Sequence, residues 1–372
     1  MNILITGANG FIGRNLRVNL ASIQDSGFNL LCYDLDNQPE DLVRFCQQAD
    51  FVIHLAGVNR PQHADEFYQG NRDLTEQIIQ VLESQRNFIP ILLSSSTQAE
   101  LDNDYGKSKL QAEGLVFAYG RRNQVPVYVY RLPGVFGKWC RPNYNSVVAT
   151  FCHNIARGEQ VVVNGRETAL TLAYIDDVVQ EFIAALRDKP YQNPDGYCSV
   201  PVIHQTTLGQ LVDLIESFHA SRQSLTVADM SAPFEKKLYS TYLSFLPDDG
   251  FAYLPEMRVD DRGSFTELVK TPDRGQVSVN IAKPGVTKGN HWHNTKNEKF
   301  IVVAGEAIIR FRQIGTDRII EYAVSGDLIT IVDIPVGYTH NITNSGDTDM
   351  VFIIWCNEVF DPDRPDTFYE EV

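Results

Sequence analysis

The stretch Gly285–Gly305, GVTKGNHWHNTKNEKFIVVAG, places two histidines and a glutamate close together in a strand-like context. Side chains two residues apart on a β-strand project from the same face, so His291 and His293 point together while Trp292 points away. Glu298 returns on the next strand, and a later histidine adds a third imidazole. Imidazole and carboxylate groups are common metal ligands. The predicted ligands are His291, His293, Glu298 and His340.

A His-x-His pair can also be a solvated sheet edge, so the surrounding spacing decides between the two interpretations. Gly285 is followed after five residues by His291, and Glu298 by Gly305 after six. This run resembles the first signature of the cupins, and Pro335, Gly337, His340 and Asn344 resemble the second. The resemblance predicts a metal-binding barrel. The ligand types alone suit zinc, iron, manganese or nickel.

Composition limits the class of protein. A chain of 372 residues with 43% hydrophobic residues suggests two or more domains with buried cores. A net charge of −15 argues against a nucleic-acid partner. The opening MNILITG is already strand-like, and no long apolar run follows, so we expect neither a leader nor a membrane span. The six cysteines form no CxxC pair, as expected for reduced thiols in a cytoplasmic protein.

The beginning of the chain has the pattern of a dinucleotide site. A short apolar strand, Asn2–Thr6, runs into GANGFIG with Gly7, Gly10 and Gly13, and a helix is predicted next. Glycines allow close approach to a pyrophosphate, and a helix amino terminus offers free N–H groups. The alternative is an ordinary glycine turn. Asp34 ends the next strand, where a carboxylate binds ribose hydroxyls and repels a 2′-phosphate, which by itself favours NADH.

Strands and helices alternate over the following residues. Strands are predicted at 50–57 and 90–96 with a helix over 71–84 between them, which indicates an α/β Rossmann-type, doubly wound parallel sheet. Tyr105 and Lys109 then lie one helical turn apart, on one face. A lysine ammonium beside a phenol lowers the pKa of the phenol, so the tyrosine can give a proton to a carbonyl and recover it. A hydroxyl from Ser94 to Thr97 can hold the carbonyl oxygen.

These motifs make the first 240 or so residues resemble the extended short-chain dehydrogenase/reductase family, whose members act largely on nucleotide sugars. The resemblance implies a catalytic set of Ser96, Tyr105 and Lys109. Eight residues separate Ser96 from Tyr105, fewer than is usual, and Gly134 stands where the family has an asparagine. The implied cofactor-binding residues are Gly7, Asn9, Gly10, Phe11, Ile12, Gly13, Asp34, Leu55, Ala56, Gly57, Tyr105 and Lys109.

Beyond Leu243 the chain becomes rich in proline, glycine and aspartate, and then in short alternating strands. We predict a reductase domain over 1–243, a linker over 244–257 and an all-β cupin barrel over 258–372. The barrel sequence resembles the deoxysugar 3,5-epimerase branch of the cupins, which use a histidine as a base beside a keto group. His291 occupies that place, and Lys288 stands where that branch usually has arginine.

Two sets of charged residues each have two possible roles, and the sequence does not decide between them. Lys138, Arg141 and Arg157 form a small basic cluster that either meets a diphosphate or is a solvated helix face. Asp261 and Arg262 either contact substrate or form a structural ion pair.

Over its whole length the sequence resembles a family of bifunctional capsule enzymes, in which a reductase is fused to a zinc cupin. Phrases such as KWCRPNYNSV and KGNHWHNTKNEKF carry this resemblance. It implies a UDP-linked 4-keto-6-deoxy-N-acetylhexosamine as substrate, NADPH as reductant, Zn2+, and a homodimer formed through the cupin. The alternatives are a 4-reductase with a structural, dimerising cupin, and a non-catalytic dinucleotide-sensing protein.

Overall fold

The computed structural model describes residues 1–24 and 27–372, which fall into two compact units. The first unit comprises Met1–Glu216 and Pro233–Pro247, and the second comprises Ser217–Ala232 and Asp248–Val372. The division falls inside one helix, α8 (Leu208–Ser224). The predicted boundaries at residues 243 and 258 stay predictions, and each unit is described by itself.

A five-stranded parallel sheet in the order β2-β1-β3-β4-β5 forms the centre of the first unit. Its strands are short and apolar because helices bury both faces. The observed sheet confirms the predicted Rossmann-type fold, and β1 has the predicted bounds. The strands are β1 (Asn2–Thr6), β2 (Asn29–Tyr33), β3 (Phe51–His54), β4 (Ile91–Ser96) and β5 (Val127–Leu132).

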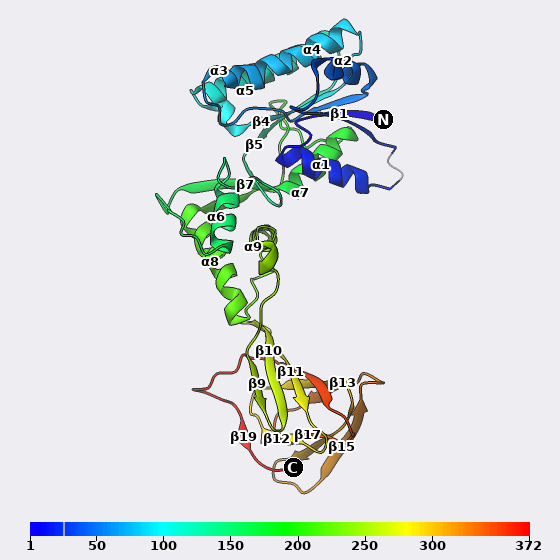
Figure 1. The fold of residues 1–372 in the computed structure, drawn as a ribbon, viewed down its shortest axis with the longest axis vertical. Helices are drawn as coiled ribbons and strands as arrows, with labels where there is room; N and C mark the ends of the chain where they lie inside the picture. Colours follow the sequence, from blue (N-terminus) through cyan, green and yellow to red (C-terminus); the bar gives the residue numbers. More distant parts are fainter. Residues whose placement is uncertain (25–26) are drawn as a thin grey trace. The chain divides into compact units, whose positions relative to one another are not determined.

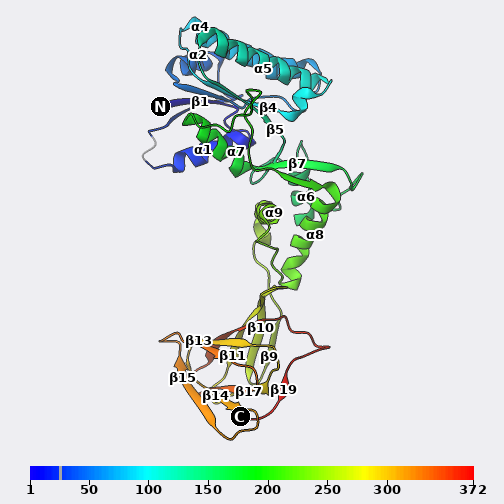
Figure 2. The same cartoon turned by 180° about the vertical axis from the view of Figure 1, so that it is seen from behind.

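Helices cover the two faces of this sheet in separate groups: α2, α4 and α5 on one face, α1 and α7 on the other (Figures 1 and 2). Each group closes its own apolar core, one around Leu42 and Val116 and the other around Leu16 and Phe182. These helices are α1 (Phe11–Ser22), α2 (Pro39–Gln48), α4 (Leu74–Ser84), α5 (Asp104–Asn123) and α7 (Ile175–Leu186).

The helix predicted over 71–84 begins earlier than expected. A short α3 (Asp65–Phe67) leads into a π-helical segment, η1 (Tyr68–Asp73), which continues directly into α4. Between β4 and α5 lies a 3-10 turn, η2 (Thr97–Glu100). Single π-helical turns often occur at functional sites.

The remainder of the first unit is a smaller layer beside the sheet. A three-stranded sheet has the order β6-β7-β8. Its elements and the neighbouring helices are β6 (Gly134–Phe136), α6 (Val147–Ala156), β7 (Ala169–Tyr174), β8 (His204–Thr207) and α9 (Pro233–Leu243).

The second unit consists of two antiparallel sheets that enclose one apolar core around Phe300, Ile309 and Phe352, as the predicted cupin fold requires. One sheet has the order β16-β13-β18-β11-β10-β9 and the other β15-β14-β17-β12-β19. Their strands follow a 3-10 turn, η3 (Asp248–Gly250). They are β9 (Met257–Asp260), β10 (Gly263–Thr271), β11 (Gly275–Ala282), β12 (Thr287–Trp292), β13 (Glu298–Ala304), β14 (Glu306–Gln313), β15 (Ile319–Ser325), β16 (Ile331–Ile334), β17 (Tyr338–Asn344), β18 (Met350–Cys356) and β19 (Phe368–Tyr369).

The segment that follows α8 belongs to the second unit because it pairs with β10. Lys270 N–H donates to Leu225 O at 2.8 Å, and Val227 N–H donates to Lys270 O at 3.0 Å.

Among the helices that the structure describes, none is both long enough and apolar enough to cross a bilayer.

Two glycines of α5 should respond oppositely to alanine. A Cβ on Gly114 meets nothing within 4 Å, whereas a Cβ on Gly120 lies 3.0 Å from both methyl groups of Val127. We expect Gly114→Ala to raise the free energy of unfolding by about 0.5–1 kcal/mol, because alanine is the better helix former. Gly120→Ala should lower it by about 1–3 kcal/mol through overpacking. Urea unfolding followed by circular dichroism measures both, and a destabilised Gly114→Ala variant would contradict this interpretation.

Candidate functional site

The glycine loop after β1 has the close backbone packing that a dinucleotide site needs. Gly7 has φ +68°, and a Cβ there would lie 2.7 Å from Ala56 N. A Cβ on Gly13 would lie 2.3 Å from Gly7 O. Gly10 precedes α1, and no side chain caps that helix. The open N–H groups at the start of α1 are therefore available to a phosphate.

Asp34, the residue predicted to bind the ribose, lies against this loop. Its Oδ2 accepts the Asn9 backbone N–H at 2.7 Å, and its Oδ1 accepts the Leu35 N–H at 2.9 Å. A cation that the sequence analysis did not single out lies on the same loop: Arg17 Nη1 donates to Asn9 Oδ1 at 2.7 Å and to Ala8 O at 3.3 Å. The loop therefore carries a carboxylate and a guanidinium together.

The sheet and α5 bring together the predicted Ser96, Tyr105 and Lys109. Ser96 ends β4, and its hydroxyl is close enough to the Tyr105 side chain to lower the pKa of the phenol. Lys109 is 6% exposed, and its Nζ donates to Ser94 O at 3.2 Å. A Cβ on Gly57 would lie 3.1 Å from Lys109 Nζ, so Gly57 keeps the space around the ammonium open.

Burial shifts both titrating groups of this set. It lowers the pKa of Lys109 to about 8, against the attraction of Glu113, which raises it. It also raises the pKa of Tyr105, more than the Ser96 hydroxyl lowers it. The prediction of a net lowering of the phenol pKa is wrong for this structure, because loss of solvent around the phenol outweighs the lowering by Ser96.

Asn71 joins this site without having been predicted. It lies in η1, and its side-chain amide binds both backbone groups of Val58. Nδ2 donates to Val58 O at 3.1 Å, and Oδ1 accepts Val58 N–H at 3.0 Å. Nδ2 also donates to Ser108 Oγ at 3.0 Å. Its Oδ1 would lie 2.7 Å from a Cβ on Gly57. Helical periodicity gave no signal for this residue, because a π-helical turn breaks it.

A second buried group that was not predicted holds β4 against α5. Glu113 is 1% exposed and accepts Ser95 Oγ at 2.5 Å and Tyr197 OH at 3.0 Å. Arg131 makes several bonds to the same carboxylate, at 2.7–3.2 Å, and lies over the Tyr197 ring. This network fixes the strand end that carries Ser96.

A cavity of about 450 Å³ opens beside Tyr105. Amide side chains dominate its lining, and Asp104 is its one charged residue. Such a lining suits the uncharged hydroxyl and amide groups of a sugar. The lining residues are Asn59, Phe67, Gln98, Asn103, Asp104, Tyr105 and Asn145.

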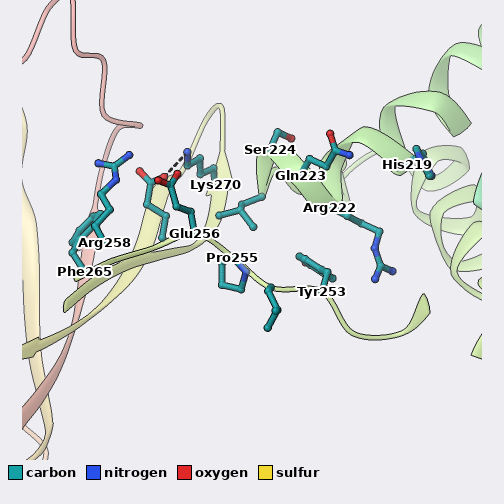
Figure 3. Close-up of a pocket in the computed structure, with 13 residues that line it drawn as sticks. His219, Arg222, Gln223, Ser224, Tyr253, Pro255, Glu256, Arg258, Phe265 and Lys270 are labelled. Atoms are coloured by element: carbon teal, nitrogen blue, oxygen red, sulfur yellow. Dashed lines mark ion pairs between the residues drawn. The ribbon is translucent and has the colours of Figure 1, made fainter. Parts of the chain in front are cut away.

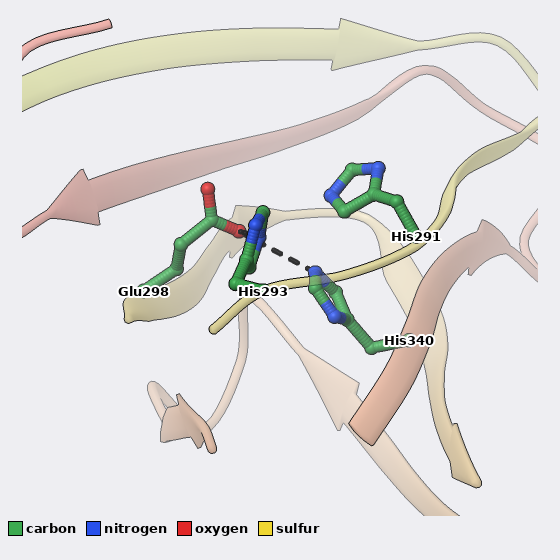
Figure 4. A group of neighbouring side chains, drawn as sticks. All are labelled: His291, His293, Glu298 and His340. Carbon is green, nitrogen blue, oxygen red and sulfur yellow. Dashed lines mark ion pairs between the residues drawn. The ribbon is translucent and has the colours of Figure 1, made fainter. Parts of the chain in front are cut away.

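In the second unit, the four predicted metal ligands converge (Figure 4). One possible ligand atom from each of His291, His293, Glu298 and His340 lies within 4.8 Å of all the others. Glu298 Oε2 lies 3.4 Å from His340 Nε2 and 3.7 Å from His293 Nε2.

A β-bulge turns His291 toward this cluster. In the pairing of β12 with β17, Gly289 lies opposite Asn341 and His291 opposite His340, so the register shifts at Asn290. Asn290 has φ +63°, the left-handed conformation that asparagine tolerates well.

The residues fit a metal ion with imidazole and carboxylate ligands. His293 is 2% exposed and His340 is fully buried, yet neither Nε2 has a hydrogen-bond partner among the residues that the structure describes. Buried polar nitrogens normally have partners. Burial followed by the neighbouring His340 lowers the pKa of His291 to about 4, which keeps the imidazole neutral and able to bind a metal. Burial raises the pKa of Glu298, but the two facing imidazoles and Lys296 lower it by more.

The charged residues with two possible roles have the following contacts. Arg262 pairs with Asp260 at 2.6 Å and not with Asp261, because a turn between β9 and β10 brings the Asp260 carboxylate into reach. In the basic cluster, Lys138 pairs with Asp176, Arg141 lies over the Tyr144 ring, and Arg157 donates to Phe245 O at 2.9 Å. A diphosphate contact of this cluster and a substrate contact of Asp261 and Arg262 stay open alternatives.

Lys288 is held by the barrel itself. Its Nζ donates to Ser264 O at 3.0 Å and to Ile281 O at 2.8 Å, and burial lowers its pKa. The ammonium is fixed on two backbone carbonyls rather than offered as a free charge.

The second unit also contains a cavity of about 690 Å³ between the end of α8 and β10 (Figure 3). It includes none of the predicted site residues. Its cations have local contacts: Arg222 donates to Gly250 O at 2.5 Å and lies over the Tyr253 ring, and Lys270 pairs with Glu267 at 2.8 Å. We assign this cavity no part in the chemistry.

Comparison with known proteins matches the two units to two family models. Residues 3–196 match the NAD dependent epimerase/dehydratase family, and residues 258–368 match the polysaccharide biosynthesis C-terminal domain. The chain belongs to the NAD dependent epimerase/dehydratase family and carries the second domain behind it.

Two relatives extend over the full length. The chain is 45% identical to the UDP-2-acetamido-2,6-beta-L-arabino-hexul-4-ose reductase of Pseudomonas aeruginosa, over 99% of this chain and 98% of the relative. It is 54% identical to the capsular polysaccharide assembling protein CapF of Staphylococcus aureus, with a TM-score of 0.94 and complete coverage of both chains. The full-length resemblance predicted from the sequence is confirmed.

Lys109 gives a stability test of the reductase site. Its pKa, about 8 in the folded protein, is below the ordinary value of 10.5, so the buried ammonium destabilises the fold below pH 8. Lys109→Met should therefore raise the free energy of unfolding by about 1–3 kcal/mol at pH 7. The advantage should shrink as the pH rises from about 8 toward 10.5, where the parent loses the proton in both states. Urea unfolding at several pH values measures this, and a pH-independent difference would contradict the buried charge.

Proposed function

We propose that the chain is a bifunctional nucleotide-sugar enzyme. The second unit would epimerise C3 of UDP-2-acetamido-2,6-dideoxy-L-arabino-hexos-4-ulose, and the first would reduce the C4 ketone to give UDP-2-acetamido-2,6-dideoxy-L-talose. The observation that carries the proposal is the presence, in one chain, of a Ser96, Tyr105 and Lys109 set and a cluster of three imidazoles with one carboxylate. The name of the Pseudomonas aeruginosa relative supports this substrate class.

In the reductase site, the residues are arranged to handle one proton. The Ser96 and Tyr105 hydroxyls would hold the C4 oxygen of the sugar, and Tyr105 would donate its proton to that oxygen. The buried Lys109 would stabilise the tyrosinate that is left. A bound nicotinamide would supply the hydride for C4, so the ketone would become an alcohol with one new C–H and one new O–H bond. The amide-lined cavity beside Tyr105 would receive the sugar.

In the barrel, His291, His293, Glu298 and His340 would hold the metal. A bound divalent ion would polarise the sugar carbonyl and acidify the proton at C3. A neutral His291 and an ionised Glu298, as their lowered pKa values indicate, leave the lone pairs of these two residues free for the ion.

The chemistry fixes the order of the two steps. The C3 proton is acidic only while C4 is a ketone, so epimerisation must come first. Reduction removes that acidity and retains the new configuration at C3. We place the pair of steps on the route to UDP-N-acetyl-L-fucosamine for capsule or O-antigen polysaccharide, with Zn2+ as the metal and a cytoplasmic homodimer joined through the cupin. The likeness to the capsular polysaccharide assembling protein CapF supports the capsule route, and the metal, the dimer and the final sugar rest on the family resemblance of the sequence.

Crossed variants test the two activities. The protein is mixed with a UDP-4-keto-6-deoxy-N-acetylhexosamine in deuterated water, with and without NADPH, and C3 exchange and cofactor oxidation are followed. Tyr105→Phe should lower cofactor oxidation by about 100-fold or more, since the proton donor is lost, and leave C3 exchange intact. Glu298→Gln should abolish exchange and leave the reductase site unchanged. Exchange that survives Glu298→Gln would reduce the barrel to a structural, dimerising part, and parent protein without oxidation would favour a sensing role.

For the cofactor we propose NADPH, with NADH as the alternative that Asp34 supports. Arg17 is the observation in favour of NADPH, because its guanidinium contacts the same loop as Asp34 and can pair with a 2′-phosphate.

Arg17→Gln separates the two cofactors. It should raise the KM for NADPH by about 10-fold and that for NADH much less, because only NADPH carries the phosphate. Steady-state kinetics with each cofactor measures the ratio. Asp34→Asn is the matched control and should favour NADPH further; equal effects of Arg17→Gln on both cofactors would contradict the assignment.

A further inference from the structure

We infer that the segment 366–370, here called the strap, is a working part of the barrel's metal centre, holding the segment 291–293 that supplies two of its four ligands. The inference rests on the metal site of the proposed function and adds to it residues that offer no ligand atom themselves. None of the strap residues was predicted from the sequence.

The strap orients His293 directly. The backbone carbonyl of Asp366 accepts the His293 Nδ1–H at 2.5 Å. A donor at Nδ1 leaves the lone pair on Nε2, which is the nitrogen that faces Glu298 Oε2. Hydrogen bonds to the far nitrogen of a ligand histidine fix both its tautomer and its orientation. Asp366 therefore sets His293 in the form that a metal requires.

The carboxylate of Asp366 holds the turn behind His293. It accepts backbone N–H groups from Asn294 at 3.0 Å, Thr295 at 2.7 Å and Lys296 at 2.9 Å. The Thr295 hydroxyl and the Asn294 amide donate to it as well, at 3.1 and 3.2 Å. This turn joins His293 to Glu298, so one carboxylate fixes the path between two ligands.

The remainder of the strap pairs with the strand that carries His291. In the β19–β12 pairing, Tyr369 lies opposite His291 and Phe368 opposite Trp292, whose rings stack at 4.7 Å. Glu370 N–H donates to Asn290 O at 3.1 Å, next to the bulge that turns His291 inward.

Further contacts of Glu370 anchor the strap. The Thr339 hydroxyl donates to Glu370 O, beside the ligand His340. Arg312 pairs with the Glu370 carboxylate at 2.9 Å.

Glu298 is held by other residues. Its Oε1 accepts the Cys356 thiol at 3.2 Å and lies 3.4 Å from Lys296 Nζ, which leaves Oε2 to face the imidazoles. Loss of the strap contacts should therefore loosen the segment that carries His291 and His293, whereas Glu298 should stay in place.

Zinc affinity of the full-length protein tests the inference. Parent and variants are stripped of metal and titrated with Zn2+ in competition with a chromophoric chelator. Asp366→Ala should weaken Zn2+ binding by about 10–100-fold, the range typical of residues that support metal ligands. Asp366→Asn, which keeps one acceptor oxygen, should fall between Asp366→Ala and the parent. Asp363→Ala is the matched control, since that carboxylate is exposed in the same connection, and should bind Zn2+ as the parent does.

A second readout separates positioning from stability. The visible spectrum of the Co2+-substituted protein reports ligand geometry, and we expect it to change in Asp366→Ala. An unchanged dissociation constant for Zn2+, with a lower Tm of the metal-free protein, would give the strap a purely structural role and overturn the inference. A parent protein that binds no Zn2+ would instead overturn the metal site of the proposed function.

Discussion

The interior of the barrel has to accommodate two imidazole nitrogens and a carboxylate oxygen that face one another with almost no exposure to solvent. His293 Nε2 and His340 Nε2 lie 3.7 and 3.4 Å from Glu298 Oε2, and all three side chains are almost fully buried. Such groups are unfavourable in an apolar core unless something satisfies them. A metal ion bound by these side chains would satisfy them, and the bulge at Asn290 would give that ion a further ligand, His291.

The first unit also contains a buried polar group, the Lys109 ammonium, which is stabilised in another way. Lys109 is nearly as well buried, but a backbone carbonyl at 3.2 Å and an acidic residue one turn along α5 support its ammonium. The Glu113 network also fixes the end of β4. In both units, therefore, groups that are expensive to desolvate are held in the orientation that carbonyl chemistry needs. In the proposed function a ketone at C4 is the common requirement, because it would be both the source of acidity at C3 and the group to be reduced.

Much of the fold and of the candidate site could be predicted because the signals were local. A glycine-rich turn behind a strand, a tyrosine and lysine one turn apart, and a His-x-His pair each occupy a few neighbouring residues. Asn71, Arg17 and Asp366 could not be found this way. Asn71 lies in a π-helical turn, and Asp366 meets His293 across 73 residues. The pKa of Tyr105 was misjudged because burial is a property of the folded chain, not of a motif.

The long connection between His293 and Asp366 also bears on the order of folding. Closing a loop of 73 residues opposes the contact by roughly 4 kcal/mol of chain entropy, and contacts between residues distant in sequence form late. Hairpins such as β10–β11 and β14–β15 close over far shorter distances. The contact between the strap and His293 is accordingly expected to form late in assembly of the barrel. A metal site that depends on this contact would be complete only in the fully folded domain, and a partly folded chain would compete poorly for the ion.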